Sequence, residues 1–104
     1  MNQNEFADLT ERIRAFADAR NWEKFHTPKN LAMAIAGEAG ELAAEFQWLT
    51  AEESAPGSLT PEQLQAIKLE IADVQIYLLR LADVLNVDIP AVVIEKMAIN
   101  ESRF

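Results

Sequence analysis

Apolar side chains recur along the chain with the period of an α-helix. In the first segment four of them follow one another at spacings of three and four residues, which places them on one helical face. These residues are Phe6, Leu9, Ile13 and Phe16. The spacing predicts a first helix over about residues 3–20, followed by an irregular connector over residues 20–26.

Three dipeptide or tripeptide signals mark further helix starts. Thr27-Pro28 and Thr60-Pro61 each place a capping side chain before a proline, and proline suits the first helical turn. Gln63 follows Thr60 at the spacing of a capping box. Asp88-Ile89-Pro90 is a similar start. The sequence therefore predicts helices over about residues 28–49, 61–86 and from 89 onward, with a loop over residues 50–59.

No segment combines strand-like alternation with hairpin turn residues, so the predicted fold class is all-α. With a length of 104 residues and no linker, we expect one domain over residues 1–104, built as a four-helix bundle. The apolar stripe of the third helix consists of Ile67, Ile71, Val74, Leu78 and Leu85. The apolar faces of the second and third helices are broad, so we expect a partner subunit to complete the core.

Charge and composition exclude several classes of function. The formal net charge of −8 disfavours binding to a nucleic-acid backbone. No apolar run approaches the roughly 18 residues of a membrane span, and the N-terminus lacks the order of a signal peptide. Cysteine is absent, which excludes disulfides and thiolate ligands and fits a reducing cytoplasm. We therefore expect a cytoplasmic protein.

Two pairs of carboxylates interrupt the helical pattern. Glu38 and Glu41 form one pair, and Glu70 and Asp73 form the other; each pair is spaced i,i+3. Residues three apart are neighbours on a helix, and Glu38 falls among the apolar positions of its helix. Burying an unpaired carboxylate is unfavourable unless it is neutralised or bound to metal. Spacing alone leaves open both a metal site and an ordinary solvated acidic face.

Carboxylate oxygens favour hard cations, so the metal expected at such a site is Mg²⁺, with Mn²⁺ as a substitute. A bundle di-iron site would need Glu-x-x-His pairs, but the one histidine, His26, lies in the connector. Zinc is disfavoured for the same lack of nitrogen and sulfur ligands. Gly37 and Gly40 weaken the predicted second helix, which is easier to explain if another group approaches the backbone there.

The order of several short blocks is more specific than the carboxylate spacing. These blocks are Asn21-Trp22-Glu23-Lys24-Phe25-His26-Thr27-Pro28-Lys29-Asn30-Leu31, Gly37-Glu38-Ala39-Gly40-Glu41-Leu42, Glu45-Phe46-Gln47-Trp48, Glu70-x-x-Asp73-Val74-Gln75-Ile76-Tyr77-Leu78 and Lys96-Met97-Ala98-Ile99-Asn100-Glu101-Ser102-Arg103. In this order they resemble the MazG-like, all-α nucleoside triphosphate pyrophosphohydrolases, in particular the dCTP-pyrophosphatase branch. The resemblance covers nearly the whole chain.

The resemblance implies hydrolysis of a nucleoside triphosphate, dCTP-like or another dNTP, to the monophosphate and pyrophosphate. Glu38, Glu41, Glu70 and Asp73 would then hold the metal, and relatives of this kind form homodimers or homotetramers. Glu41 or Glu45 would handle the attacking water, and the sequence does not decide between them. The physiological role expected is house-cleaning or control of the nucleotide pool.

The resemblance also implies substrate contacts. The phosphate side would be bound by Lys96, Asn100 and Arg103. The base and sugar side would be bound by Trp22, His26, Trp48 and Tyr77. His26 is equally suited to capping or packing before the second helix, and either tryptophan is also suited to a purely structural role.

Two departures from the family pattern, Ile13 and Ile99, stand where relatives often carry polar residues, so the preference for a particular base stays open. The alternative to an enzyme is a non-catalytic helical module that oligomerises or binds nucleotide without cleaving it.

Overall fold

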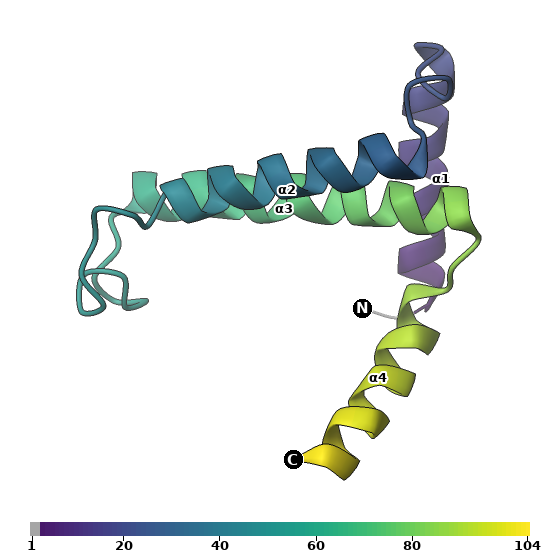
Figure 1. The fold of residues 1–104 in the computed structure, drawn as a ribbon. Helices are drawn as coiled ribbons and strands as arrows, with labels where there is room; N and C mark the ends of the chain where they lie inside the picture. The colour runs from purple at the N-terminus through teal and green to yellow at the C-terminus, as the bar shows by residue number, and fades with distance from the viewer. Residues whose placement is uncertain (1–2) are drawn as a thin grey trace.

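The computed structural model describes residues 3–104 as four α-helices joined by turns (Figure 1). The helices are α1 (Gln3–Ala19), α2 (Pro28–Ala44), α3 (Pro61–Leu85) and α4 (Ile89–Arg103). Residues 3–104 contain no strand, so the predicted all-α class is confirmed. Met1 and Asn2, the first residues of the predicted domain, lie outside the described part. None of the described helices combines the length and hydrophobicity needed to cross a membrane.

The helix starts are those that the capping signals predict. Thr27 Oγ1 accepts a backbone N–H of the first turn of α2 at 3.2 Å. At α3 the capping box is complete: Gln63 N–H donates to Thr60 Oγ1 at 3.1 Å, and Thr60 N–H donates to Gln63 Oε1 at 2.8 Å. Asp88 Oδ1 accepts a first-turn N–H of α4 at 3.1 Å. Each cap satisfies a donor that the helix itself leaves unpaired.

Two asparagines end α1 and α3. Asn21 and Asn86 have φ values of 55° and 62°, in the left-handed region that asparagine tolerates better than most residues. After each of them, the next backbone N–H donates to the carbonyl five residues back, at 3.0 Å for α1 and 2.8 Å for α3. This is the Schellman arrangement, which pairs the last carbonyls of a helix and turns the chain sharply.

The predicted end of the second helix is wrong. The sequence pattern predicts a helix to residue 49, but α2 ends at Ala44, and residues 45–48 form turns. Phe46 N–H donates to the carbonyl of Ala43 at 3.0 Å, and Leu49 N–H donates to that of Phe46 at 2.9 Å. Hydrogen bonds over three residues tighten the backbone and redirect the side chains, although the apolar spacing continues.

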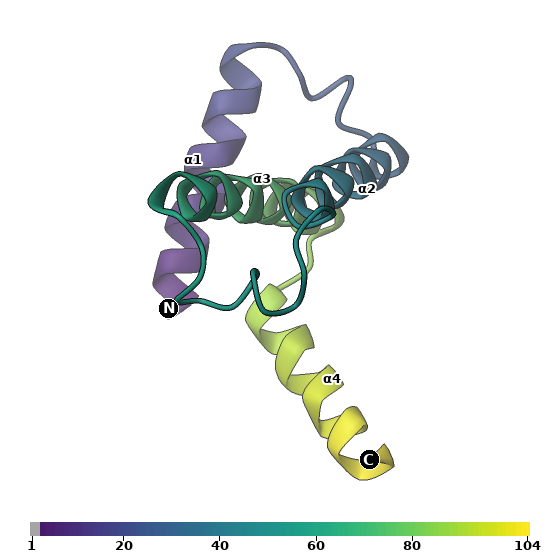
Figure 2. The same cartoon turned by 90° about the vertical axis from the view of Figure 1, so that its left-hand side faces the viewer.

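The helices α2 and α3 form an antiparallel hairpin, which α1 crosses (Figures 1 and 2). The last helix, α4, leaves the end of α3 and points away from this hairpin. The radius of gyration is 16.2 Å, against about 13 Å for a compact domain of this length. A single copy therefore exposes more surface than a globular domain of its size.

Few side chains are fully buried in this arrangement. Those in the apolar core are Ala17, Leu31, Ile67 and Leu79. Of the stripe expected in the core of α3, only Ile67 is buried, whereas Ile71 and Leu85 are each 52% exposed. Phe16 of the predicted α1 stripe is also exposed, and α4 buries no side chain. The apolar stripes are placed on helices as predicted, but one chain alone does not cover them.

Candidate metal centre

Three carboxylates converge where α2 packs against α3. Glu38 comes from α2, and Glu70 and Asp73 lie one turn apart on α3. Each offers one oxygen, and these oxygens all lie within 4.8 Å of one another. Carboxylates held this close repel one another, and a bound cation would offset that repulsion. The group therefore matches the donor set of a hard divalent cation.

The environment of Glu70 fits a bound cation. Its Oε2 is buried and has no hydrogen-bond partner. Loss of hydration raises the pKa of Glu70, and the charges of Asp73, Glu38, Glu41 and Glu45 raise it further. No cationic side chain of residues 3–104 pairs with this carboxylate. A divalent cation would satisfy the unpaired oxygen and offset the repulsion.

Glu41 and Glu45 lie at the edge of this group. Glu41 is exposed on α2 and is not among the three converging carboxylates. Glu45 is half-buried at the C-cap of α2. Both are near enough to affect the charge of Glu70. Within residues 3–104 no group approaches Gly37 or Gly40 as expected, because an added Cβ at either would meet nothing within 4 Å.

The aromatic residues expected to bind the base and sugar do not form one cluster. Trp22 packs edge-on against Phe16 with ring centroids 5.5 Å apart, and its ring lies 5.9 Å from that of His26. Tyr77 lies one turn beyond Asp73 on α3 and is half-buried. Trp48, in the turn after α2, is 87% exposed. One copy does not enclose Trp48, so any stacking role would need a further surface beside it.

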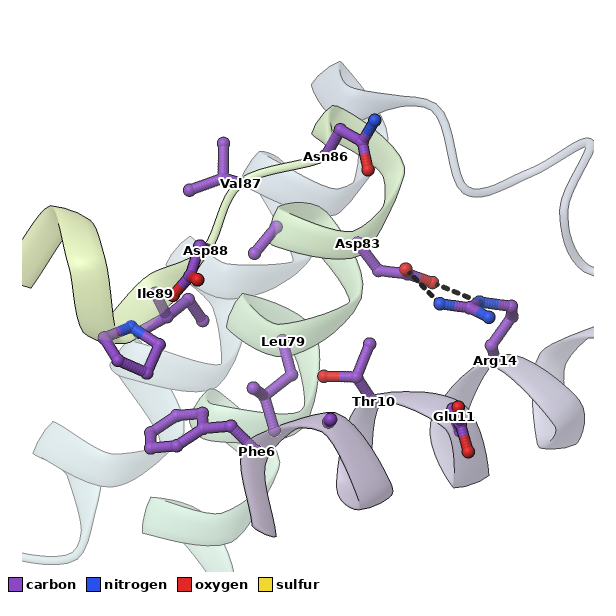
Figure 3. Close-up of a pocket in the computed structure, with 13 residues that line it drawn as sticks. Phe6, Thr10, Glu11, Arg14, Leu79, Asp83, Asn86, Val87, Asp88 and Ile89 are labelled. Carbon is purple, nitrogen blue, oxygen red and sulfur yellow. Dashed lines mark hydrogen bonds and ion pairs between the residues drawn. The ribbon is translucent and has the colours of Figure 1, made fainter. Parts of the chain in front are cut away.

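Sequence reasoning missed a charged network beside His26. Arg80, only 6% exposed, donates from Nε to His26 Nδ1 at 3.0 Å and from Nη1 to Asp83 Oδ2 at 3.2 Å. Arg14 of α1 donates to the same carboxylate from Nε at 2.8 Å and from Nη2 at 2.6 Å (Figure 3). These hydrogen bonds lower the pKa of Asp83, that from Arg14 most strongly. The i,i+3 pair of Arg80 and Asp83 was the available signal, but His26 lies 54 positions from Arg80, and Arg14 lies 69 positions from Asp83.

The residues expected to contact phosphate lie on α4. Lys96 and Arg103 are exposed, and Asn100 is half-buried. Because α4 points away from the α2–α3 hairpin, one copy does not bring these residues to the carboxylates (Figures 1 and 2). The guanidinium of Arg103 instead lies 5.2 Å from the ring centre of Phe104. The metal group and the expected phosphate ligands are thus separate in a single chain.

A hollow of about 470 Å³ lies away from the carboxylates, between α1, the end of α3 and the start of α4 (Figure 3). Phe6 and Leu79 line its apolar part, and the ion pair between Arg14 and Asp83 lies at its edge. It contains none of the predicted site residues. The hollow is therefore a separate feature of the fold.

Comparison with known proteins adds a family and a structural neighbour. The model of the MazG-like family matches residues 33–103. A pyrophosphatase from Archaeoglobus fulgidus superposes with a TM-score of 0.88 at 39% identity, and the match covers 96% of this chain and 92% of that one.

Curated relatives are similar over most of the chain. The protein named dCTP pyrophosphatase 1 of Homo sapiens is 47% identical over 97 residues, and that of Bos taurus is 45% identical over the same length. Each match covers 93% of this chain but 57% of the relative. The chain therefore spans little more than half the length of these relatives.

Proposed function

The chain belongs to the MazG-like family, and we propose that it hydrolyses nucleoside triphosphates to the monophosphate and pyrophosphate. The observation that carries the proposal is the convergence of Glu38, Glu70 and Asp73 around a buried, unpaired oxygen. Similarity to proteins named dCTP pyrophosphatase 1 and to an archaeal pyrophosphatase supports it. The substrates we propose are dCTP or other deoxynucleoside triphosphates, in house-cleaning or control of the nucleotide pool in the cytoplasm.

In the proposed reaction the oxygen of water bonds to the α-phosphorus, and the bond from that phosphorus to the α–β bridging oxygen breaks. Pyrophosphate leaves with the bridging oxygen, and the water gives up its proton. Glu38, Glu70 and Asp73 would hold Mg²⁺, for which Mn²⁺ can substitute, with Glu41 as a fourth ligand. The bound metal supplies charge neutralisation for the phosphates and lowers the pKa of a water.

Two glutamates are candidates for orienting the water or accepting its proton. Glu41 and Glu45 both lie next to the converging carboxylates, and neither has a cationic partner among the described residues. Replacing each with glutamine separates the roles. The water-handling residue should lose turnover while Mg²⁺ affinity is kept, whereas a ligand should lose Mg²⁺ affinity as well.

We assign the nucleoside to the opposite end of the hairpin from the α2–α3 loop. Asp73, Tyr77 and Arg80 follow one stripe of α3 toward His26 and Trp22. A nucleotide whose phosphates lie at Asp73 would thus place its sugar near Tyr77 and its base near Trp22. Trp48, which is exposed on one copy, would contact the base from an assembled oligomer.

We further propose that the phosphate ligands come from a second copy of the chain, in a homodimer or homotetramer. Among residues 3–104 the three converging carboxylates have no cationic partner, and α4, which carries Lys96, Asn100 and Arg103, points away from them (Figure 1). The same helix exposes apolar residues that association would cover, among them Val93, Ile94 and Met97. The acidic site of one copy facing the cationic side chains of Lys96 and Arg103 on another is the complementary arrangement expected at such an interface.

The direct test is a panel of ribo- and deoxynucleoside triphosphates with Mg²⁺, with identification of both products. We expect monophosphate and pyrophosphate in equal amounts, with dCTP among the best substrates. Release of orthophosphate, or binding without turnover of any triphosphate, would overturn the proposal; the second result would favour a non-catalytic nucleotide-binding module.

Mixing two inactive variants tests the shared site. Glu70→Gln removes a metal ligand, and Lys96→Ala with Arg103→Ala removes phosphate ligands, so each variant alone should be inactive. A mixed dimer contains one site with both sets intact, so random pairing should restore about a quarter of the wild-type activity. If mixing restores nothing, the α4 residues do not act across copies.

A further inference from the structure

The hydrogen bond between Arg80 and His26 can have only one direction. A guanidinium group is always protonated and carries donors alone. Arg80 Nε lies 3.0 Å from His26 Nδ1, so Nδ1 must accept this hydrogen bond with its lone pair. The proton of the neutral imidazole is therefore on Nε2.

The surroundings favour the neutral form of His26. Partial burial lowers its pKa, and the charge of Arg80 lowers it further, while Glu23 opposes the shift. Within residues 3–104, Nε2 has no hydrogen-bond partner. His26 thus offers one N–H donor that the described chain does not use.

Arg80 is itself held in place from two sides. Asp83 accepts a hydrogen bond from Arg80 Nη1 at 3.2 Å, and Arg14 fixes that carboxylate through two further hydrogen bonds (Figure 3). Arg80 is a buried residue, 6% exposed, so water does not compete freely for its donors. The network joins α1, α3 and the connector that carries His26.

The spacing along α3 between the carboxylates and Arg80, which holds His26, matches the length of a nucleotide. Arg80 follows Asp73 by seven residues, which is two helical turns, so both lie on nearly the same face of α3. Seven residues advance the helix by about 10 Å. This is comparable to the separation between the phosphates and the base of one nucleotide.

We propose that Arg80 is a positioning residue that fixes His26 as the Nε2–H tautomer, so that His26 donates a hydrogen bond to an acceptor atom of the nucleotide base. The inference rests on the proposed function for the identity of the ligand. Cytosine offers two such acceptors, the O2 carbonyl and the N3 lone pair. Trp22, whose ring lies 5.9 Å from that of His26, would pack beside the same base.

Nuclear magnetic resonance on the full chain tests the tautomer without any variant. The chain has one histidine, so its ring nitrogens are assigned without ambiguity. We expect a proton on Nε2 and a scalar coupling across the hydrogen bond between Arg80 Nε and His26 Nδ1. A proton on Nδ1, or no such coupling, would overturn the proposal.

Addition of the product dCMP tests the contact with the base. The Nε2–H resonance should shift on titration with dCMP but not with deoxyribose 5-phosphate, which lacks a base. If triphosphates are hydrolysed and the resonance does not move, this inference fails while the proposed function stands. If no triphosphate is hydrolysed and the resonance moves with dCMP, the inference stands while the proposed function fails.

Enzyme kinetics of two Arg80 variants then separate a role in positioning His26 from a role in the stability of the fold. Arg80→Met keeps the apolar bulk, and Arg80→Lys keeps the charge without the Nε donor, while Asp83 stays paired with Arg14. Both variants should raise KM for dCTP about tenfold with kcat unchanged, the value of one hydrogen bond. A dNTP analogue with a phenyl ring in place of the base should show no such increase.

The exposed Arg12→Met on α1 is the matched control and should leave KM unchanged. An equal rise in KM for dCTP and the phenyl analogue would mean that Arg80 acts only on stability, and the proposal would be wrong.

Discussion

At the scale of single residues, Glu70 shows how spatial neighbours determine the role of a side chain. On the sequence it is one of 17 acidic residues, and its spacing from Asp73 is common on solvated helices. In the fold its Oε2 is buried without a partner beside Glu38 of the neighbouring helix. The combination of burial and like charge distinguishes it from the exposed glutamates.

Glu70→Gln should weaken Mg²⁺ binding and raise the stability of the metal-free protein, because the amide removes one of the converging charges. Affinity should fall by more than the roughly 10- to 100-fold that loss of an outer-shell partner of a metal site causes. Calorimetric titration with Mg²⁺ and thermal unfolding in a chelator measure the two effects. Glu52→Gln, exposed in the loop between α2 and α3, is the control and should change neither.

Asp83→Asn should destabilise the fold by about 2 kcal/mol at neutral pH, between the values for an exposed and a buried ion pair. The folded state holds the pKa of Asp83 below its ordinary value of 3.8, chiefly through the hydrogen bond from Arg14. The contribution of Asp83 is therefore fully present above pH 3.8 and is lost as the pH falls through the lower, folded pKa.

Urea unfolding at several pH values measures this difference. The difference in the free energy of unfolding between wild type and variant should stay constant from pH 7 to about pH 5 and should decrease only below pH 3.8. Asp8→Asn, at an exposed position of α1, is the control. A gap that does not change on acidification would show that the carboxylate charge is not what stabilises this contact.

At the scale of helices and turns, local signals could be predicted from the sequence and long-range ones could not. Thr27, Thr60 and Asp88 cap helices through neighbours within three residues, so their effect can be read locally. The early end of α2 depends on how the chain turns back toward α3, and the apolar spacing does not report it. The bond from Arg80 to His26 joins residues 54 positions apart, and no local pattern indicates such a pair.

In the candidate site, too, the local arrangement could be predicted from the sequence and the long-range arrangement could not. The i,i+3 spacing predicts that each carboxylate pair shares a helix face, and the antiparallel packing of α2 on α3 brings Glu38 to Glu70 and Asp73. Glu41 shares the face of Glu38 but is rotated from it by about 60°, because three steps of about 100° each turn a side chain through about 300°, and it lies outside the converging group. The distance of Lys96 and Arg103 from this group depends on the direction of α4, which the sequence pattern does not indicate.

Thr60→Ala should lower the free energy of unfolding by about 1 kcal/mol, because it removes the side-chain half of the capping box at α3. Thr60→Ser keeps the hydroxyl and is the matched control, with a change of only a few tenths. Urea unfolding of both variants at pH 7 checks the prediction. Equal destabilisation by alanine and serine would mean that the methyl group, rather than the hydrogen bond, is important.

At the scale of the whole molecule, a single copy is extended and leaves much apolar surface exposed. Its radius of gyration is larger than that of a compact domain, and large apolar side chains stay exposed on every helix. Formal net charge of −8 keeps such a chain soluble only if these surfaces are covered or scattered. Association of copies is the arrangement that would cover them.

Ile94→Glu should shift the protein toward monomer and remove activity while leaving the helices intact. Ile94 is 70% exposed in one copy, so its replacement should leave the fold of a single chain almost unchanged. Burial in an interface would make the change unfavourable by about 2 kcal/mol or more, which is roughly a 30-fold weaker association.

Light scattering over a range of concentrations, together with circular dichroism, measures both properties. Gln65→Glu adds the same charge at an exposed position of α3 and is the control. A variant that stays fully associated and active would place Ile94 outside any interface.

The direction of α4 has a consequence for the rate law of the proposed hydrolysis. Suppose that the phosphate ligands of each site come from the α4 of another copy. A monomer would then contain the metal ligands but could not bind a triphosphate until it associates with another copy. Below the dissociation constant of the assembly, doubling the protein should raise the total rate about fourfold, and above it only about twofold. Dilution alone would then stop hydrolysis, so the triphosphates would not be consumed when the concentration of the protein is low.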